Sequence, residues 1–231
     1  YDITYTVAGL TDWLHRNGFS YKNPKGQPAK ADAEKQQAFI DTYQVLKEKT
    51  PENEPILFID AVHATMATKT SRGWIQKGID KIISTTASRT RLNIVGAIEL
   101  SSMKIVKDNY DTINADSIIS FLQLVKASYP AAPQIHIILD QSGYHRSGDI
   151  REYAEKNNIK LNFLPPYSPN LNPIERLWKV MNERVRDNYF FKSAKDFRER
   201  IGEFFESILP EIVESLRSRI NDNFQLLNAA K

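Results

Sequence analysis

Two short apolar runs, each ending in an aspartate, place the strongest constraint on how this chain can fold. The first is "ILFID" at residues 56–60, and the second is "IHIILD" at residues 135–140. A strand that is apolar on both faces belongs inside a parallel sheet, because helices then cover both of its sides. We therefore predict that 56–60 and 135–139 are neighbouring parallel strands. Asp60 and Asp140 should then lie together at the carboxyl edge of the sheet, where open α/β folds place their sites.

Further strands and helices are predicted around this central pair. The segments "RLNIVGAIEL" (91–100) and "SMKIVKDNY" (102–110) have the pattern of two strands joined tightly in a hairpin, and "LNFLP" (161–165) that of another strand. The spacing of apolar residues predicts helices at 5–17, 32–49, 114–130, 148–157, 173–187, 194–208 and 211–226. Strands, then strands alternating with helices, then helices alone indicate an α/β fold with helices on the faces of the sheet.

Basic residues are concentrated in two stretches, although the net charge of the whole chain is only +3. Residues 62–98 hold six Lys or Arg against one acid, and residues 176–200 hold eight against four. This asymmetry suits a polyanion such as nucleic acid, and it also describes an ordinary solvated face.

The chain has no cysteine and only four histidines. A thiolate zinc site and a disulfide framework are therefore excluded, and a reducing cytoplasm is the expected compartment. No apolar run approaches the roughly 20 residues of a membrane-spanning helix, so no association with a membrane is predicted.

A proline-rich loop, "LPPYSPNLNPIERLW" (164–178), leads into a helix and sets Glu175 in its first turn. Four of the eleven prolines of the chain fall within nine positions here, so the loop has few backbone conformations to lose. One interpretation is structural: Asn172 caps the helix, Pro173 takes its first position, and Glu175 bonds back to the cap. The other interpretation is that the rigid loop delivers Glu175 to a site.

Asp60, Asp140 and Glu175 gain a different meaning when they are considered together. Singly, an aspartate after a strand is a common turn or capping residue. Three carboxylates within about 5 Å of one another would repel by roughly 3 kcal/mol per pair at an effective dielectric of 20, so such a cluster does not serve stability. Hard divalent cations such as Mg²⁺ relieve this repulsion, and two of them can clamp the attacking and leaving oxygens of a displacement at phosphorus.

These segments resemble the DDE transposases of bacterial insertion sequences, in the mariner-type superfamily. The resemblance is carried by "FIDAVH", "ILDQSGYHRS", "LPPYSPNLNPIERLWKVMNERV" and "RGWIQKG", with 34 residues between Asp140 and Glu175. It extends from about residue 5 to residue 208. It implies a ribonuclease H-like mixed sheet flanked by helices, with a helical N-terminal linker segment and a helical C-terminus.

The resemblance also implies an activity and its cofactor. Asp60, Asp140 and Glu175 would hold two Mg²⁺ ions, with Mn²⁺ able to substitute, and Asp60 would contact both ions. The enzyme would hydrolyse a phosphodiester at each transposon end and join the freed 3′-hydroxyl to target DNA, typically at a TA dinucleotide, as a homodimer. Two alternatives stay open: an inactive or domesticated DNA-binding protein, and a structure-specific nuclease of the same fold.

Two parts of the chain are distinguished on the same grounds. Residues 1–50 are predicted to be a remnant of a helix-turn-helix DNA-binding region with a linker helix, and residues 51–231 the catalytic domain. Full-length relatives carry paired helix-turn-helix modules, so this chain is expected to bind transposon ends weakly.

Seven further side chains are candidates for contacts with DNA, because cationic residues position nucleic-acid backbones. They are His63, Arg72, Lys77, His145, Arg146, Arg176 and Lys179. For the two histidines a local hydrogen bond beside the site is an equal alternative. For Lys179 the simpler account is a helical ion pair with Glu175, four residues before it.

Two positions next to these motifs have their own interpretation. Gln141 stands where relatives often have Asn after the second aspartate, and we interpret it as a tolerated change. Trp178 shares an apolar helical stripe with Ile174, Leu177 and Met181, which predicts a place in the core.

Overall fold

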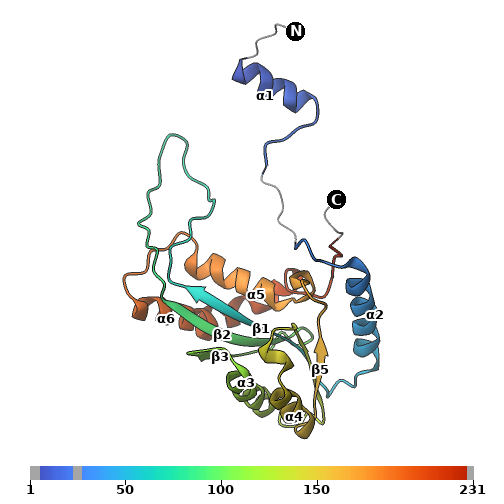
Figure 1. Ribbon diagram of the computed structural model, residues 1–231. Helices are drawn as coiled ribbons and strands as arrows, with labels where there is room; N and C mark the ends of the chain where they lie inside the picture. Colours follow the sequence, from blue (N-terminus) through green and yellow to red (C-terminus); the bar gives the residue numbers. More distant parts are fainter. Residues whose placement is uncertain (1–5, 23–27, 228–231) are drawn as a thin grey trace.

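The computed structural model describes residues 6–22 and 28–227, and its centre is a five-stranded mixed sheet (Figure 1). The strands are β1 (Ile56–Thr65), β2 (Arg91–Glu99), β3 (Ile105–Tyr110), β4 (Ile135–Leu139) and β5 (Ile159–Phe163). Their order is β3-β2-β1-β4-β5. β1, β2 and β3 pair antiparallel, whereas β1, β4 and β5 pair parallel. The predicted hairpin and the predicted central parallel pair are both confirmed.

β1 is twice as long as the predicted strand, and this changes the position of Asp60. We expected the strand to end at Asp60, but β1 continues to Thr65 because its antiparallel pairing with β2 runs on to Arg91. The parallel pairing with β4 stops earlier, at Phe58 opposite Ile138. Asp60 and Asp140 each follow that last pair by two residues, so they reach the same level of the sheet.

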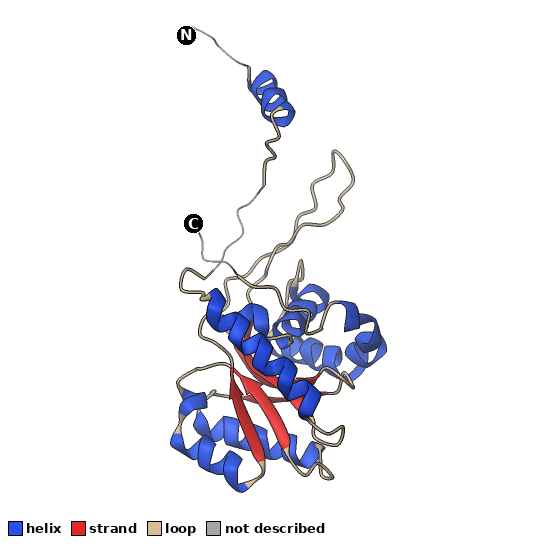
Figure 2. Ribbon diagram, turned by 90° about the vertical axis from the view of Figure 1, so that its right-hand side faces the viewer, coloured by secondary structure: helices blue, strands red, loops and turns tan. Residues whose placement is uncertain are grey.

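Helices cover both faces of the sheet and form two separate apolar cores (Figure 2). α3 (Ala115–Ser128) and α4 (Gly148–Lys156) pack against one face. α2 (Ala33–Lys49), α5 (Ile174–Met181) and α6 (Ala194–Glu203) pack against the other. This arrangement confirms the α/β prediction.

Capping side chains fix where several helices begin. The Asp32 carboxylate accepts a hydrogen bond from the Lys35 amide, as predicted for the start of α2. Asn114 and Ser117 form a reciprocal capping box at the start of α3. Each such bond satisfies an amide that the first helical turn would otherwise leave unpaired.

The C-terminal helices differ from the prediction. The expected break between residues 208 and 211 is absent, because α6 continues through a π-helical turn (Phe204–Ile208) into α7 (Leu209–Ile212). A 3₁₀ helix (Val213–Ser218) follows, so helical structure ends well before the expected residue 226.

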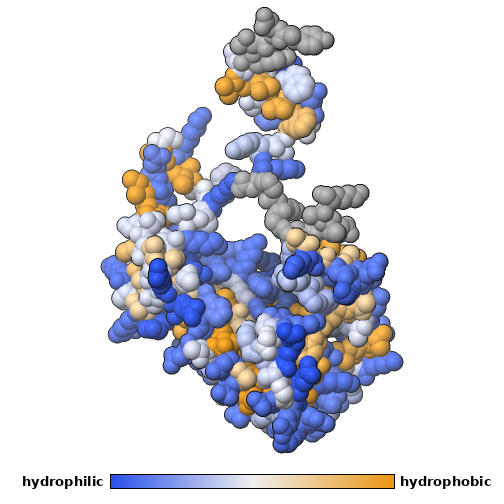
Figure 3. Space-filling view, viewed as in Figure 1, coloured by the Kyte–Doolittle hydropathy of each residue, from blue (hydrophilic) through white to orange (hydrophobic). Residues whose placement is uncertain are grey.

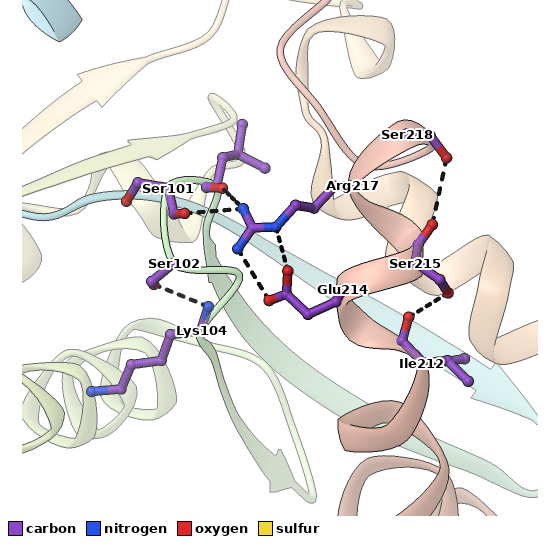
Figure 4. A network of polar contacts seen from close by, with 9 residues as sticks. Ser101, Ser102, Lys104, Ile212, Glu214, Ser215, Arg217 and Ser218 are labelled. Atoms are coloured by element: carbon purple, nitrogen blue, oxygen red, sulfur yellow. Dashed lines mark hydrogen bonds and ion pairs between the residues drawn. The ribbon is translucent and has the colours of Figure 1, made fainter.

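Arg217 joins this C-terminal end to the β2–β3 turn (Figure 4). Its guanidinium pairs with Glu214 and donates to the carbonyl oxygens of Leu100 and Ser101 at 3.3 and 3.0 Å. This contact fixes the C-terminal helices to the end of the sheet at which β1 begins and β2 ends.

Two segments project from this body (Figure 1). α1 (Val7–Arg16) has no buried residue, and residues 66–90 form a long excursion between β1 and β2. Apolar side chains gather on both projections in Figure 3. Trp74 and Ile82, in the excursion at 66–90, are almost wholly exposed. Among the described residues, no helix is both long and apolar enough to cross a bilayer.

Candidate active site

Asp60 projects from the middle of β1 toward α5. Its Oδ2 accepts a hydrogen bond of 2.9 Å from the indole Nε1 of Trp178. Burial, together with the charge of Glu175 and a smaller effect of Asp140, raises the pKa of Asp60 to about 7. The site therefore holds a carboxylate whose ionised form lacks a cationic partner.

Asp140 follows β4 directly and is held by three hydrogen bonds. His145 Nδ1 lies 2.6 Å from its Oδ1, the Ser142 amide donates to the same oxygen at 3.0 Å, and the Ser142 hydroxyl donates to Oδ2 at 2.7 Å. Burial alone would raise the pKa of Asp140, but the hydrogen bonds from His145 and Ser142 outweigh it and hold the pKa at about 2. Asp140 is therefore ionised throughout the physiological range.

Glu175 lies in the first turn of α5, and the predicted cap at this helix is wrong. The Asn172 side chain does not cap α5; it is 4% exposed, and its Nδ2 donates to the Ile59 carbonyl at 3.1 Å. The proline loop is thereby tied to β1 next to Asp60. Partial burial and the charge of Asp140 raise the pKa of Glu175. Its carboxylate makes no hydrogen bond with any residue of 6–22 or 28–227, so it is available to a ligand.

The three carboxylates line a single cavity of about 380 Å³ between β1, β4 and the proline loop. The described part of the chain contains no cluster of three or more His, Asp or Glu side chains that could hold a single metal ion. The three carboxylates therefore do not converge on one point. The predicted convergence is thus a shared cavity rather than a ready-made three-carboxylate ligand set.

Of the seven candidate DNA contacts, Arg146 lines this cavity, and so does Gln141, the residue after Asp140. Arg146 is exposed there, where a cationic side chain can meet a phosphate. Gln141 lines the same cavity, and its Nε2 donates to the Leu164 carbonyl at 2.9 Å. Gln141 therefore helps to hold the start of the proline loop.

His63 lies outside the cavity of the three carboxylates. His63 follows Asp60 by three residues in the same strand, so its side chain points to the opposite face of the sheet. There its Nδ1 lies 2.8 Å from Asn93 Oδ1, and Asn93 in turn donates to two carbonyl oxygens beside β3. His63 thus makes the local hydrogen bond that was the alternative, and as an exposed residue it stays a candidate DNA contact.

His145 is enclosed and faces Asp140 rather than the solvent. Its side chain is 1% exposed and packs edge-on against Tyr144 while Nδ1 faces Asp140. A side chain this deeply enclosed reaches DNA only through a rearrangement, whereas it already contacts a carboxylate of the site.

Arg176 and Lys179 both differ from prediction. The Arg176 guanidinium is used within the protein: its Nη1 donates to the carbonyls of Arg219 and Asn221 and to Asn221 Oδ1 at 2.9–3.2 Å. Lys179 is exposed, and the expected ion pair with Glu175 is not among the ion pairs of the described residues. Arg176 is structural, and Lys179 remains a candidate contact.

Replacing Arg176 by alanine is expected to reduce the free energy of unfolding by about 1–3 kcal/mol, because the C-terminal carbonyls lose a charged donor. The affinity for DNA should stay within twofold of wild type. Chemical denaturation and fluorescence anisotropy measure the two quantities, and Arg151→Ala, at an exposed arginine of α4, is the matched control. A large loss of DNA affinity in Arg176→Ala at unchanged stability would restore its role as a DNA contact.

Tyr167, at the rim of the cavity, was not predicted from the sequence. Tyr167 is 54% exposed, its φ is 57°, and the ammonium of Lys30 lies 5.6 Å from the centre of its ring. A left-handed backbone is unusual for a non-glycine residue and is held here by a loop with prolines on both sides. An aromatic residue between the prolines of "PPYSP" was the available signal.

The mixed sheet in the order β3-β2-β1-β4-β5, flanked by helices, defines a ribonuclease H-like fold, and an acidic cavity lies at the carboxyl end of β4. Residues 55–198 match the model of the DDE superfamily endonucleases, so the chain belongs to this family. Residues 1–43 match a winged helix-turn-helix model. The family resemblance inferred from the sequence is confirmed.

The chain is similar to three known proteins. It is 23% identical over 199 residues to the insertion element IS630 uncharacterized 39 kDa protein of Shigella sonnei, covering 86% of this chain and 58% of that protein. The mariner Mos1 paired end complex with Mg has a TM-score of 0.64 at 17% identity, covering 94% of this chain and 72% of that one. The catalytic domain of Mos1 mariner transposase has a TM-score of 0.56 at 15% identity, covering 88% and 100%. The chain thus spans somewhat more than half of its Shigella relative.

Proposed function

We propose that this chain is the catalytic part of a DNA transposase. It would hydrolyse a phosphodiester at each transposon end and transfer the resulting 3′-hydroxyl to target DNA, at TA dinucleotides. The observation that carries the proposal is the single cavity lined by carboxylates from three separate elements of a ribonuclease H-like fold. Membership of the DDE endonuclease family supports it.

The donor set of this cavity fits a hard divalent cation. Glu175 raises the cost of ionising Asp60, Asp140 raises that of Glu175, and Asp140 is itself ionised; no basic side chain of the described residues contributes to the shift of Asp60 or Glu175. Mg²⁺ is usually held by one or two carboxylates together with water and substrate phosphates, so a cluster of three around one point is not needed. Asp60, Asp140 and Glu175 would hold the ions. Bound ions would polarise the phosphodiester and activate the attacking oxygen.

The surrounding residues would hold the DNA strand over the carboxylates. Arg146 offers a charge to a phosphate, and Tyr167 offers an exposed ring face to a base at the rim of the same cavity. The winged helix-turn-helix match at residues 1–43 supports recognition of transposon ends by the N-terminal part. Two chains would act together on the paired ends.

A strand-transfer assay separates this function from a nuclease of the same fold. Duplex ends with a precleaved 3′-hydroxyl are incubated with target plasmid and Mg²⁺ or Mn²⁺, and joined products are mapped by sequencing. A transposase gives joined products at TA sites that disappear in EDTA and in Asp140→Asn. Cleavage without joining would indicate the nuclease, and DNA binding without either reaction would indicate an inactive binding protein.

Arg72 and Lys77 lie on the exposed excursion between β1 and β2, away from the carboxylates, and we expect them to act through phosphate charge alone. Each cation that neutralises a phosphate contributes about 0.9 to the slope of log K against log salt. The Arg72→Ala/Lys77→Ala variant should therefore lower that slope by about 2. Anisotropy titrations at several salt concentrations measure it. The matched control is Arg151→Ala/Lys160→Ala beside β5, and an equal drop there would contradict a specific role for the excursion.

A further inference from the structure

Two hydrogen bonds join the start of α5 to adjacent residues of β1. Asn172 Nδ2 donates to the Ile59 carbonyl at 3.1 Å, and Trp178 Nε1 donates to Asp60 Oδ2 at 2.9 Å. Asn172 and Trp178 stand three residues before and three residues after Glu175. The helix that carries one carboxylate of the cavity is thus fixed, on both sides, to the strand that carries another.

The Trp178 indole reaches Asp60 only because Gly96 leaves room for it. Gly96 pairs with Asp60 across the β1–β2 ladder. A Cβ added at Gly96 would lie 2.5 Å from Trp178 Cη2, 3.0 Å from Cζ2 and 3.3 Å from Ile174 Cδ1. Gly96 therefore lies directly beneath the indole, and the indole fills the space that a side chain at Gly96 would take.

The chemistry of the indole suits the role of a fixed positioning group. Trp178 is 3% exposed, and its Nε1 is a donor that cannot be ionised and cannot bind a metal. By holding Oδ2 it fixes the rotation of the Asp60 carboxylate and leaves Oδ1 free of this bond. The core packing predicted from the apolar stripe is correct, but it does not account for a hydrogen bond directed at a carboxylate.

We propose that Trp178 is a positioning residue that orients Asp60 for divalent-metal binding, and that Gly96 provides the space this requires. The inference rests on the proposed function, since it concerns the same carboxylates. Groups that hydrogen-bond to metal ligands typically change metal affinity or activity by 10–100-fold when they are removed. A purely structural Trp178 would instead affect only the stability of the fold.

The decisive variant removes the donor and keeps the shape. In a Trp13→Phe/Trp74→Phe background, Trp178 is replaced by 3-benzothienylalanine, in which sulfur takes the place of the indole N–H. Mn²⁺ binding to the protein without DNA is measured by electron paramagnetic resonance, alongside thermal unfolding in EDTA. We expect Mn²⁺ affinity to fall roughly 10–100-fold with the melting temperature nearly unchanged. Equal Mn²⁺ affinity in the two proteins would overturn the inference.

A double-mutant cycle gives a second test that does not depend on the analogue. Gly96→Ala should weaken Mn²⁺ binding in the wild-type background, because it displaces the indole from Asp60. In a Trp178→Phe background the same substitution should have little further effect, since the shorter ring no longer reaches Asp60. Additive losses in the cycle would contradict the inference.

Failure of the inference is distinguishable from failure of the proposed function. If the parent protein binds Mn²⁺ and cleaves DNA while the analogue behaves identically, only the role of Trp178 is wrong. If the parent neither binds Mn²⁺ nor cleaves, the proposed function fails and the inference with it. Emission from Trp178 as the sole tryptophan should also change on Mn²⁺ addition in the parent and not in Asp60→Asn.

Discussion

Replacing Asp60 by asparagine is expected to slow metal-dependent cleavage roughly 10³-fold and, at the same time, to stabilise the metal-free protein at pH 8. The loss of one carboxylate ligand should cost about 4 kcal/mol of transition-state stabilisation. The gain in stability has a separate cause. In wild type at pH 8, Asp60 is ionised in a buried place next to Glu175, and asparagine carries no charge there.

The sign of the stability effect follows from the raised pKa of Asp60. Its pKa is about 7 in the folded protein and about 4 in an unfolded chain, so the folded state binds the proton more tightly. This contribution to stability is fully present below about pH 4 and is lost as the pH rises through 7. The full difference corresponds to about 4 kcal/mol.

Thermal unfolding in EDTA at pH 4, 6 and 8 measures the effect. Wild type should lose stability relative to Asp60→Asn as the pH rises, and the variant should be the more stable protein at pH 8. Asp80→Asn, on the exposed excursion, is the matched control and should follow wild type. If Asp60→Asn is less stable than wild type at pH 8, other groups of the folded protein must stabilise the negative charge of Asp60.

The sheet and the triad were accessible from sequence because their signals are local. "ILFID" and "IHIILD" are apolar on both faces, and burial on both faces is a property of each run alone. Once the two strands were predicted to be parallel neighbours, it followed that Asp60 and Asp140 lie at the same height along the sheet. The family motif then added Glu175.

What the sequence did not reveal depends on contacts between distant segments. The length of β1 is set by its pairing with β2, and this pairing also decides that His63 points away from Asp60. The Arg176 guanidinium is used by carbonyls more than forty residues further along the chain. No local sequence pattern distinguishes an arginine that bonds within the protein from one that is free to bind a phosphate.

The burial of Trp178 could be predicted from the sequence, but its hydrogen bond to Asp60 could not. Its helical spacing correctly predicted that it is buried, and its burial is compatible with pure packing. The bond to Asp60 requires the register of α5 over β1 and the missing side chain of Gly96, and neither is written in the segment that contains Trp178. A residue assigned to the core from periodicity can therefore still contact a functional group.

The second large effect is expected at His145, where alanine should lower kcat about 10–100-fold without weakening DNA binding. His145 is enclosed and bonds to Asp140 Oδ1, so its removal frees a carboxylate that the site needs in one orientation. With one hydrogen bond lost, the burial of Asp140 raises its pKa from the present value of about 2. The loss of activity should consequently be greater at pH 5 than at pH 8, because a protonated Asp140 cannot bind a metal.

His136 provides the matched control, because it too is a buried histidine paired with a carboxylate. Its Nε2 lies 3.1 Å from Glu54 Oε2, on β4 but outside the cavity. Both His→Ala variants should lose about 2–4 kcal/mol of unfolding free energy, from the cavity and the lost hydrogen bond. Single-turnover cleavage under conditions where both variants are folded should be reduced only for His145→Ala. Equal reductions would assign the effect of His145 to stability, and a salt-dependent loss of DNA affinity in His145→Ala alone would return it to the DNA contacts.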